Sequence, residues 1–412
     1  MTSEIAVMNQ RAVALAADSA VTMGRGTKTI VRNEQRKLFQ LADGLPVGVM
    51  VFGVADLMGH PWDVLLEHFR KHANPRPLPH VRDYPAKFIA ALDRLESFFP
   101  RARMDDEYKR LLASVFRFIA NLARYLHQAG VCASHDEAMK QAIAMAWQRY
   151  QTREDGSPCR DLPCFPAGFA EAVRRDHARA TDEMIAYGFS NVSLDEAARQ
   201  QLRDIAVFCV VKDLFLEDVT GLVTAGYGAD ETYPVVVTTN VSAVVSGVVK
   251  RGEVDVTAID TEMRSGISLY ADCEASYAFL RGMELDLEAR IYGTLRSLGA
   301  NLVEQAVASF TRVDPAERES VRRMLLSQLL PDAIRRFHGT IAEYQQQAYV
   351  DPILRVLEIA TKQDLAEMAR ELVALNIFRK KARAGTQTVG GAVDVALISR
   401  EAGFAWVQRQ GG

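Results

Sequence analysis

Threonine at position 2 is the residue in this chain whose type and place could do chemistry directly. It follows Met1 and precedes an apolar segment, residues 5–8, that predicts a strand. If Met1 is removed, Thr2 carries both a hydroxyl and a free α-amine. An α-amine titrates near ~7.7–8.0, so at neutral pH part of it can act as base for the hydroxyl beside it. Because Thr2 has a small side chain, Met1 should be open to the general methionine aminopeptidase, so we expect it to be removed. Its removal leaves a nucleophile and its base on one residue.

Two charged residues stand at the ends of the next predicted strands. Asp18 closes the apolar run 12–17, and Lys37 opens the run 37–41, after which residues 47–53 form a further strand. These runs are separated by turn residues and predict two hairpins. A strand that begins this early places the amino terminus inside the fold, where termini are seldom held.

The order of these residues resembles the start of a proteasome β-type subunit and of the bacterial heat-shock peptidase with the same fold. The resemblance rests on Thr2 ahead of a strand, on Ala-Ala-Asp-Ser at 16–19, and on Lys37 at a later strand. The family are N-terminal-nucleophile hydrolases. The resemblance implies that Thr2 attacks an amide, that Lys37 favours its alkoxide, and that Asp18 orients Lys37. The spacing from Thr2 to Asp18 equals the family's, whereas the loop from Asp18 to Lys37 is slightly longer.

Residues 48–56 resemble the family segment whose paired glycines contribute a backbone oxyanion donor. The resemblance assigns that role to the backbone of Phe52 and Gly53. Phe52 stands where the first glycine of the pair would be. The amide N–H survives this change, but the ring takes up room beside it in which substrate would lie.

The accessory part of the family pattern is altered. The family has an Asp, two further residues and then Ser-Gly-Gly ahead of its last strands. Alignment on Gly390 and Gly391 puts Thr386 in place of the Asp and Val389 in place of the Ser. Thr388 offers a hydroxyl, but from the other side of a strand in that register. Thr386, Thr388 and Gly390 are the accessory candidates, and another family serine is expected within 270–276.

Composition excludes several classes of protein. The 412 residues carry a net charge of −3, which argues against a nucleic acid or an anionic membrane as the main partner. No apolar run reaches about 18 residues and no signal peptide is recognisable, so we expect no membrane span. The five cysteines are scattered and odd in number, which favours reduced thiols and a cytoplasmic location. Cys159 with Cys164, and His68 with His72, lack further ligands nearby, so we expect neither a metal nor a cofactor.

Hydrophobic periodicity divides the chain into alternating blocks. Residues 1–72 are the first part of a strand-rich core, and 73–205 are a helical insertion. Residues 206–276 are a strand meander, 277–385 a second helical block, and 386–412 the last strands. The resemblance implies an α+β protein with a four-layer αββα sandwich, in which both helical blocks are enlarged.

Two functions compete at this stage. The first is an N-terminal-threonine amidohydrolase, a proteasome-like threonine protease that cleaves peptide or amide substrates through an acyl-enzyme on Thr2. The second is a catalytically weak or inactive scaffold that binds partners through its helical blocks. The apolar faces at 88–99 and 108–119 need partners, either each other or a second subunit, and we expect a homo-oligomer.

Overall fold

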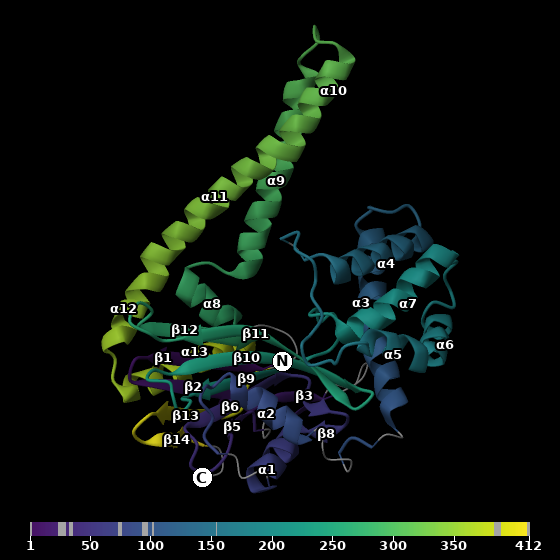
Figure 1. The fold of residues 1–412 in the computed structure, drawn as a ribbon. Helices are drawn as coiled ribbons and strands as arrows, with labels where there is room; N and C mark the ends of the chain where they lie inside the picture. Colours follow the sequence, from purple (N-terminus) through teal and green to yellow (C-terminus); the bar gives the residue numbers. More distant parts are fainter. Residues whose placement is uncertain are drawn as a thin grey trace.

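The computed structural model describes residues 2–23, 30–32, 36–72, 76–92, 98–100, 103–153, 155–382 and 389–409. It is a mixed α+β structure with antiparallel sheets at its centre, as the alternation of helical and strand blocks predicted (Figure 1). No helix in these ranges combines the length and apolar character that crossing a membrane requires.

The first large sheet is built around the beginning of the chain. Its strands lie in the order β12-β1-β2-β13-β14, and each neighbouring pair is antiparallel. The strands are β1 (Ser3–Asn9), β2 (Ala12–Asp18), β12 (Ser265–Ala271), β13 (Val393–Ser399) and β14 (Gly403–Gln408). Every residue of β1 and β2 is buried, which explains why these strands are apolar on both faces.

The second large sheet has the order β11-β10-β9-β6-β5 and is also antiparallel. Its strands are β5 (Leu38–Gln40), β6 (Val47–Gly53), β9 (Thr220–Gly226), β10 (Val235–Val245) and β11 (Val248–Ala258). Two small ribbons pair β3 (Val21–Met23) with β4 (Ile30–Arg32), and β7 (Asp56–Leu57) with β8 (His60–Pro61).

The two large sheets pack face to face. Met8 and Leu15 of the first sheet share one apolar cluster with Met50 and Val223 of the second. The alternate residues of β1, such as Ile5, point the other way, toward helix α13 (Lys362–Ala382). Helices α1 (Trp62–His72) and α2 (Asp83–Leu92) cover the outer face of the second sheet. Helices therefore lie outside both sheets.

The helical insertion forms a core of its own. It contains α3 (Met104–Gln128), α4 (His135–Gln151), α5 (Phe169–Asp176), α6 (Ala178–Gly188) and α7 (Glu196–Val211). Tyr108 and Leu111 are buried in this core, which reaches β10 at Ala243 and Val245. Phe88 is buried with α1 in a separate cluster. The faces expected to need partners thus find them within the chain, and they give no reason for a subunit contact.

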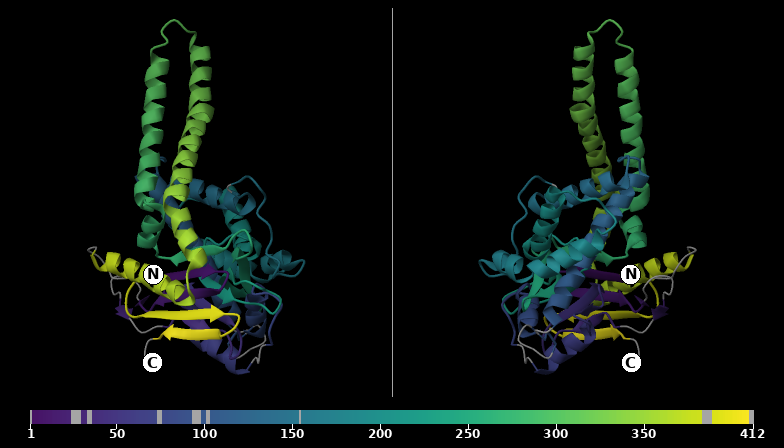
Figure 2. Two further views of the ribbon diagram at one scale, coloured as in Figure 1. Left: turned by 90° about the vertical axis from the view of Figure 1, so that its left-hand side faces the viewer. Right: turned by 90° about the vertical axis from the view of Figure 1, so that its right-hand side faces the viewer.

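A pair of long helical limbs projects from the rest of the molecule (Figures 1 and 2). The first limb is α9 (Leu285–Ala308), which follows α8 (Glu274–Arg281). The returning limb runs through α10 (Pro315–Met324), η2 (Leu325–Leu329), α11 (Leu330–Gln345), η3 (Gln346–Val350) and α12 (Asp351–Ile359). We call residues 285–350 the arm. Of its residues, only Glu288, Val307 and Gln345 are buried.

The strand boundaries differ from expectation in the middle of the chain. Residues 206–211 are the end of α7, so the strands of the meander begin only at Thr220. A short apolar run buried on all sides has no diagnostic period, which is why the sequence left the assignment of 207–211 open. The three short segments expected at 234–241, 244–249 and 254–259 are two long strands, β10 and β11, and no strand was expected where β12 lies.

Candidate active site

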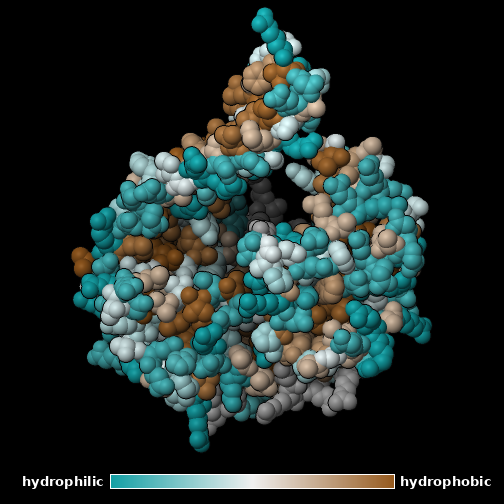
Figure 3. Space-filling model, turned by 45° about the horizontal axis from the view of Figure 1, so that its top comes forward, coloured by the Kyte–Doolittle hydropathy of each residue, from teal (hydrophilic) through white to brown (hydrophobic). Residues whose placement is uncertain are grey.

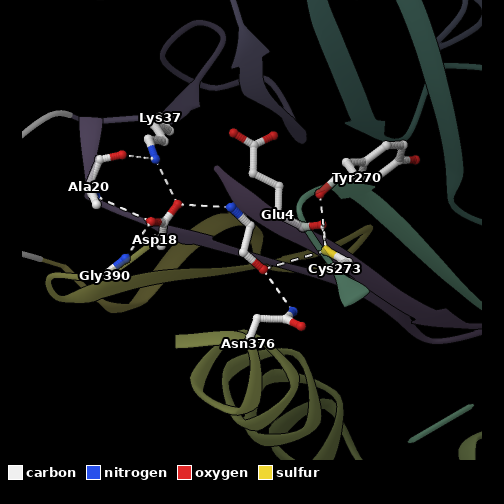
Figure 4. A network of polar contacts seen from close by, with 9 residues as sticks. Glu4, Asp18, Ala20, Lys37, Tyr270, Cys273, Asn376 and Gly390 are labelled. Carbon is white, nitrogen blue, oxygen red and sulfur yellow. Dashed lines mark hydrogen bonds and ion pairs between the residues drawn. The ribbon is translucent and has the colours of Figure 1, made fainter. Parts of the chain in front are cut away.

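Asp18 is the point on which the candidate site converges (Figure 4). It is the last residue of β2, and its side chain is fully buried. Its Oδ1 accepts hydrogen bonds from Lys37 Nζ at 2.7 Å and from the Ser3 N–H at 3.0 Å. Its Oδ2 accepts from the Gly390 N–H at 2.9 Å. One carboxylate therefore joins the starts of β1 and β5 to the loop before β13.

Lys37 lies inside the fold and not on its surface. It is 4% exposed, and besides Asp18 its Nζ donates to the Ala20 carbonyl. Its own carbonyl accepts a hydrogen bond from the Val51 N–H at 2.9 Å, which ties it to β6. A cation this deeply buried needs a charged partner and further acceptors, and both are present here.

Thr2 is held next to the Asp18–Lys37 pair by hydrogen bonds of the main chain. Its carbonyl accepts from the Asp272 N–H at 2.7 Å, and the residue is 7% exposed. The following residue, Ser3, is fastened on two sides, because its N–H donates to Asp18 and its Oγ accepts from Asn376 Nδ2 at 2.8 Å. The first residues of the chain therefore have a fixed position relative to Lys37.

Glu4 is a site residue that sequence reasoning missed. It is fully buried, and neither of its carboxyl oxygens has a hydrogen-bond partner in the described part of the chain. Burial raises the pKa of this carboxyl well above its usual range; Asp18 acts in the same direction, and Lys37 opposes it. Its carboxyl lies on the Lys37 side of β1 (Figure 4). The available signal was a lone acid directly before the apolar run 5–8.

The end of β6 carries the residues assigned to the oxyanion site. Gly53 has a φ of +87°, and a side chain there would collide with the Val219 carbonyl, so this position requires glycine. The Phe52 ring stacks on the Tyr270 ring, with centroids 5.8 Å apart. The same ring lies over Gly221, where a Cβ would collide with it. Phe52 therefore fills space between the sheets next to the strand that carries Glu4.

Of the three accessory candidates, the structure describes one, Gly390. Thr386 and Thr388 lie outside the described residues. Gly390 is at the site through its backbone, because its N–H bonds Asp18 and its carbonyl accepts from the Ser19 N–H at 3.2 Å. In the loop after β12, Asp272, whose N–H bonds the Thr2 carbonyl, forms an ion pair with Lys380 of α13 at 2.7 Å.

The serine expected within 270–276 is placed on the α13 side of β1. Ser276 Oγ donates to the Leu372 carbonyl at 2.9 Å, and Asn376 bonds both its N–H and its Oγ. Asn376 thereby joins Ser276 to Ser3. Ser276 supports the first strand from behind, which is a structural role.

A serine, a histidine and an aspartate also meet at the helical insertion. His177 Nε2 lies 3.0 Å from Ser246 Oγ, and its Nδ1 lies 3.1 Å from Asp105 Oδ1. The aspartate is 73% exposed, and Nδ1 lacks the alignment of a hydrogen bond. A catalytic triad needs the opposite arrangement, with a buried acid that orients the imidazole. Tyr108 stacks on His177, so we interpret the group as a clamp that holds the β10–β11 turn to α3.

A cavity of about 930 Å³ begins close to the site, along α1 and the edge of the second sheet. Its lining includes Leu38, which follows Lys37, and Ala55, which follows β6. Its volume falls within the range of ligand pockets. The comparisons with known proteins add no identification, because neither a protein-family model nor a curated protein matches this chain.

Proposed function

We propose that this chain has the four-layer αββα sandwich of the N-terminal-nucleophile hydrolases, of proteasome β-subunit type, and that it acts as an N-terminal-threonine amidohydrolase on peptide substrates. The observation that carries the proposal is the buried Asp18–Lys37 pair, bonded to the N–H of the residue directly after Thr2. Keeping an ion pair this well buried costs free energy, and buried charges of this kind cluster at functional sites. This pair lies beside the start of the first strand, where it could stabilise the anion of a Thr2 nucleophile.

The mechanism follows from the groups on each side of Thr2. After Met1 is removed, the Thr2 α-amine takes the hydroxyl proton while Oγ attacks the amide carbonyl. Lys37 favours the oxygen anion of Thr2, and Asp18 fixes the Lys37 ammonium. The backbone N–H groups at Phe52 and Gly53 stabilise the tetrahedral oxyanion. Collapse breaks the C–N bond, and the amine leaves with the proton held by the α-amine. Water then hydrolyses the ester on Thr2.

A scaffold without catalysis is the second candidate. It is favoured by the Phe52 ring, which is stacked on Tyr270 beside the oxyanion segment. The exchanges at Thr386 and Val389 point the same way. In that case the Asp18–Lys37 pair serves only to hold the chain start in the sheet.

Intact-mass spectrometry with a reactive probe separates the two candidates. A peptide epoxyketone combines with both the hydroxyl and the amine of an N-terminal threonine, so it reports on Thr2 as nucleophile and base together. We expect purified protein to lack Met1 and to gain one probe per chain at Thr2. Thr2→Ser should keep the adduct, whereas Thr2→Ala and heat-unfolded wild-type protein should lose it. Folded protein that retains Met1, or that loses it and takes up no probe, would contradict the enzyme.

A further inference from the structure

The arm exposes large apolar side chains along its whole length. Those at least two-fifths exposed include Leu287, Leu298, Leu302, Phe310, Leu329 and Tyr344. Brown, apolar residues are visible along the projecting limbs in Figure 3. Two helices packed only on each other bury little surface, so these side chains lack the cover that a bundle of more helices would provide.

Four apolar residues of α9, three exposed and Ile291 half-buried, form a stripe whose spacing is the same when read in either direction. Leu287, Ile291, Leu298 and Leu302 are separated by four, seven and four residues, which keeps them on one side of the helix. Leu287, Leu298 and Leu302 are 50%, 54% and 65% exposed. If a second α9 lies antiparallel, Leu287 meets Leu302 and Ile291 meets Leu298 on both sides of a two-fold axis near Thr294.

A shallow groove runs beside this stripe and gives a neighbouring helix room to approach. It is lined by Arg290, Gly293, Thr294, Ser297, Leu298 and Asn301, which recur at helical spacing on one face of α9. A Cβ at Gly293 would meet nothing within 4 Å. Small and open positions of this kind allow close helix packing.

The charge of the arm favours a copy of itself as the occupant. Residues 285–350 contain eight arginines, no lysine, and eight aspartates and glutamates, so the arm carries no net charge. A nucleic acid or an anionic membrane would select a basic surface. Two neutral arms approach without net repulsion, and the pairings named above oppose apolar to apolar.

We propose that the arm is a dimerisation element, in which α9 of one chain packs antiparallel on α9 of a second copy to form a four-helix bundle. The contact is isologous, since the same stripe serves both copies. In this arrangement the tip of each arm, at Phe310, reaches toward the base of the other arm. The bodies that carry Thr2 then lie at opposite ends, so the proposal is independent of the catalytic one.

Sedimentation velocity on the full chain tests the proposal. The monomer has a mass of 45.7 kDa, and we expect twice that mass at micromolar concentration. Leu298→Glu with Leu302→Glu should raise the dissociation constant by more than about 100-fold, because each copy would bury two like charges at the contact. Both side chains are exposed in the monomer, so its folding should not suffer. Tyr187→Glu, at an exposed residue of α6, should leave the dimer intact.

Cysteine cross-linking tests the register. Thr294→Cys lies next to the proposed axis and should form a covalent dimer under mild oxidation, whereas Ser320→Cys on α10 should not. A wild-type monomer at these concentrations would overturn the proposal, whatever else the arm binds. So would a dimer that withstands the two glutamates, or one that is cross-linked through Ser320→Cys and not through Thr294→Cys.

Discussion

Among single residues, Asp18 and Lys37 form an ion pair and also make hydrogen bonds with the main chain of several strands and loops. Asp18 gathers N–H groups from β1 and from the loop before β13, while Lys37 reaches β6 through its own carbonyl. The pair therefore links parts of both sheets at the place where the chain begins. Its loss should be visible in stability as well as in reactivity.

Lys37→Met tests this link. Removing one partner of a buried ion pair leaves the other charge uncompensated, which costs about 3–5 kcal/mol. Backbone N–H groups remain on Asp18, so we expect the lower end of that range in the free energy of unfolding from urea denaturation. Lys71→Met is the matched control. Lys71 is 63% exposed and pairs with Glu67, and exposed pairs contribute about 0–1 kcal/mol. Equal losses in the two variants would contradict the structural role of Lys37.

Glu4 predicts a dependence of stability on pH. Its pKa is raised in the folded state by burial, so between the unfolded and folded pKa values the folded protein holds one proton more. The Glu4 contribution to stability is present below the unfolded value, about 4.3, and is lost as the pH rises through the folded value. Glu4→Gln removes this titration. We expect the variant to be more stable than wild type at pH 7 and to lose that advantage near pH 4.

Urea denaturation at several pH values measures the difference. Glu67→Gln is the control, because Glu67 lies at the surface and its pKa is shifted in the opposite direction. The hydrogen bond with Lys71 lowers the pKa of Glu67. Because the shift at Glu67 is opposite in direction and the site is exposed, the difference between Glu67→Gln and wild type should be small and opposite in sign, with the variant slightly less stable at pH 7 and equal to wild type at acidic pH. A Glu4→Gln curve parallel to wild type across the range would contradict a raised pKa of Glu4 in the folded state.

Among the elements, the pairing of β6 with β9 decides how the backbone of Phe52 and Gly53, the proposed oxyanion segment, is oriented. Phe52 lies opposite Gly221 in the register, and its ring occupies the place of a side chain at that glycine. The ring and the glycine are therefore adapted to each other. Phe52 can replace a small residue only because β9 leaves room for it.

Gly221→Ala tests this adaptation. The added methyl meets the Phe52 ring, and overpacking of this kind costs about 1–3 kcal/mol. In a Phe52→Ala background the same substitution should cost much less, because the obstacle is gone. A double-mutant cycle measured by denaturation gives the coupling energy between the two positions. If the free-energy changes of Gly221→Ala and Phe52→Ala are additive, the added methyl does not contact the Phe52 ring, and this result would contradict the proposed adaptation.

At the scale of the whole molecule, the arm is joined to the body but contributes little to its core. The body clusters are formed by the sheets, by α1, α2, α13 and by the insertion. Within the arm, Tyr292 of α9 lies against Phe337 and His338 of α11, with ring centroids 6.1 and 4.9 Å apart. The two limbs are therefore side by side at that level.

Replacement of residues 293–337 by a short Gly/Ser linker should shorten the arm without unfolding the body. Two antiparallel helices can be joined by about 2–5 residues, so the linker can close at Tyr292 and His338. We expect one cooperative thermal transition within a few degrees of wild type, followed by calorimetry, together with unchanged probe capture at Thr2. A collapse of the transition would show that the arm supports the fold.

The sequence alone determined those features whose cause is local. The strands at 5–8, 12–17 and 47–53 follow from apolar runs between turn residues, and the helices from their periodicity. Asp18 and Lys37 were recognised because their order and spacing along the chain can be compared with a known pattern. The expected α+β class was confirmed, and its assignment to N-terminal-nucleophile hydrolases stays a proposal.

Only the tertiary structure decided which distant residues support the site and which surfaces stay uncovered. Asn376 reaches Ser3 across 373 positions of the chain. The burial of Glu4 depends on the second sheet closing over the first. The apolar faces of the insertion are buried within the chain, whereas the arm leaves large apolar side chains exposed. Periodicity reports that a face is apolar, but what covers that face depends on long-range packing, which leaves no periodic signal in the sequence.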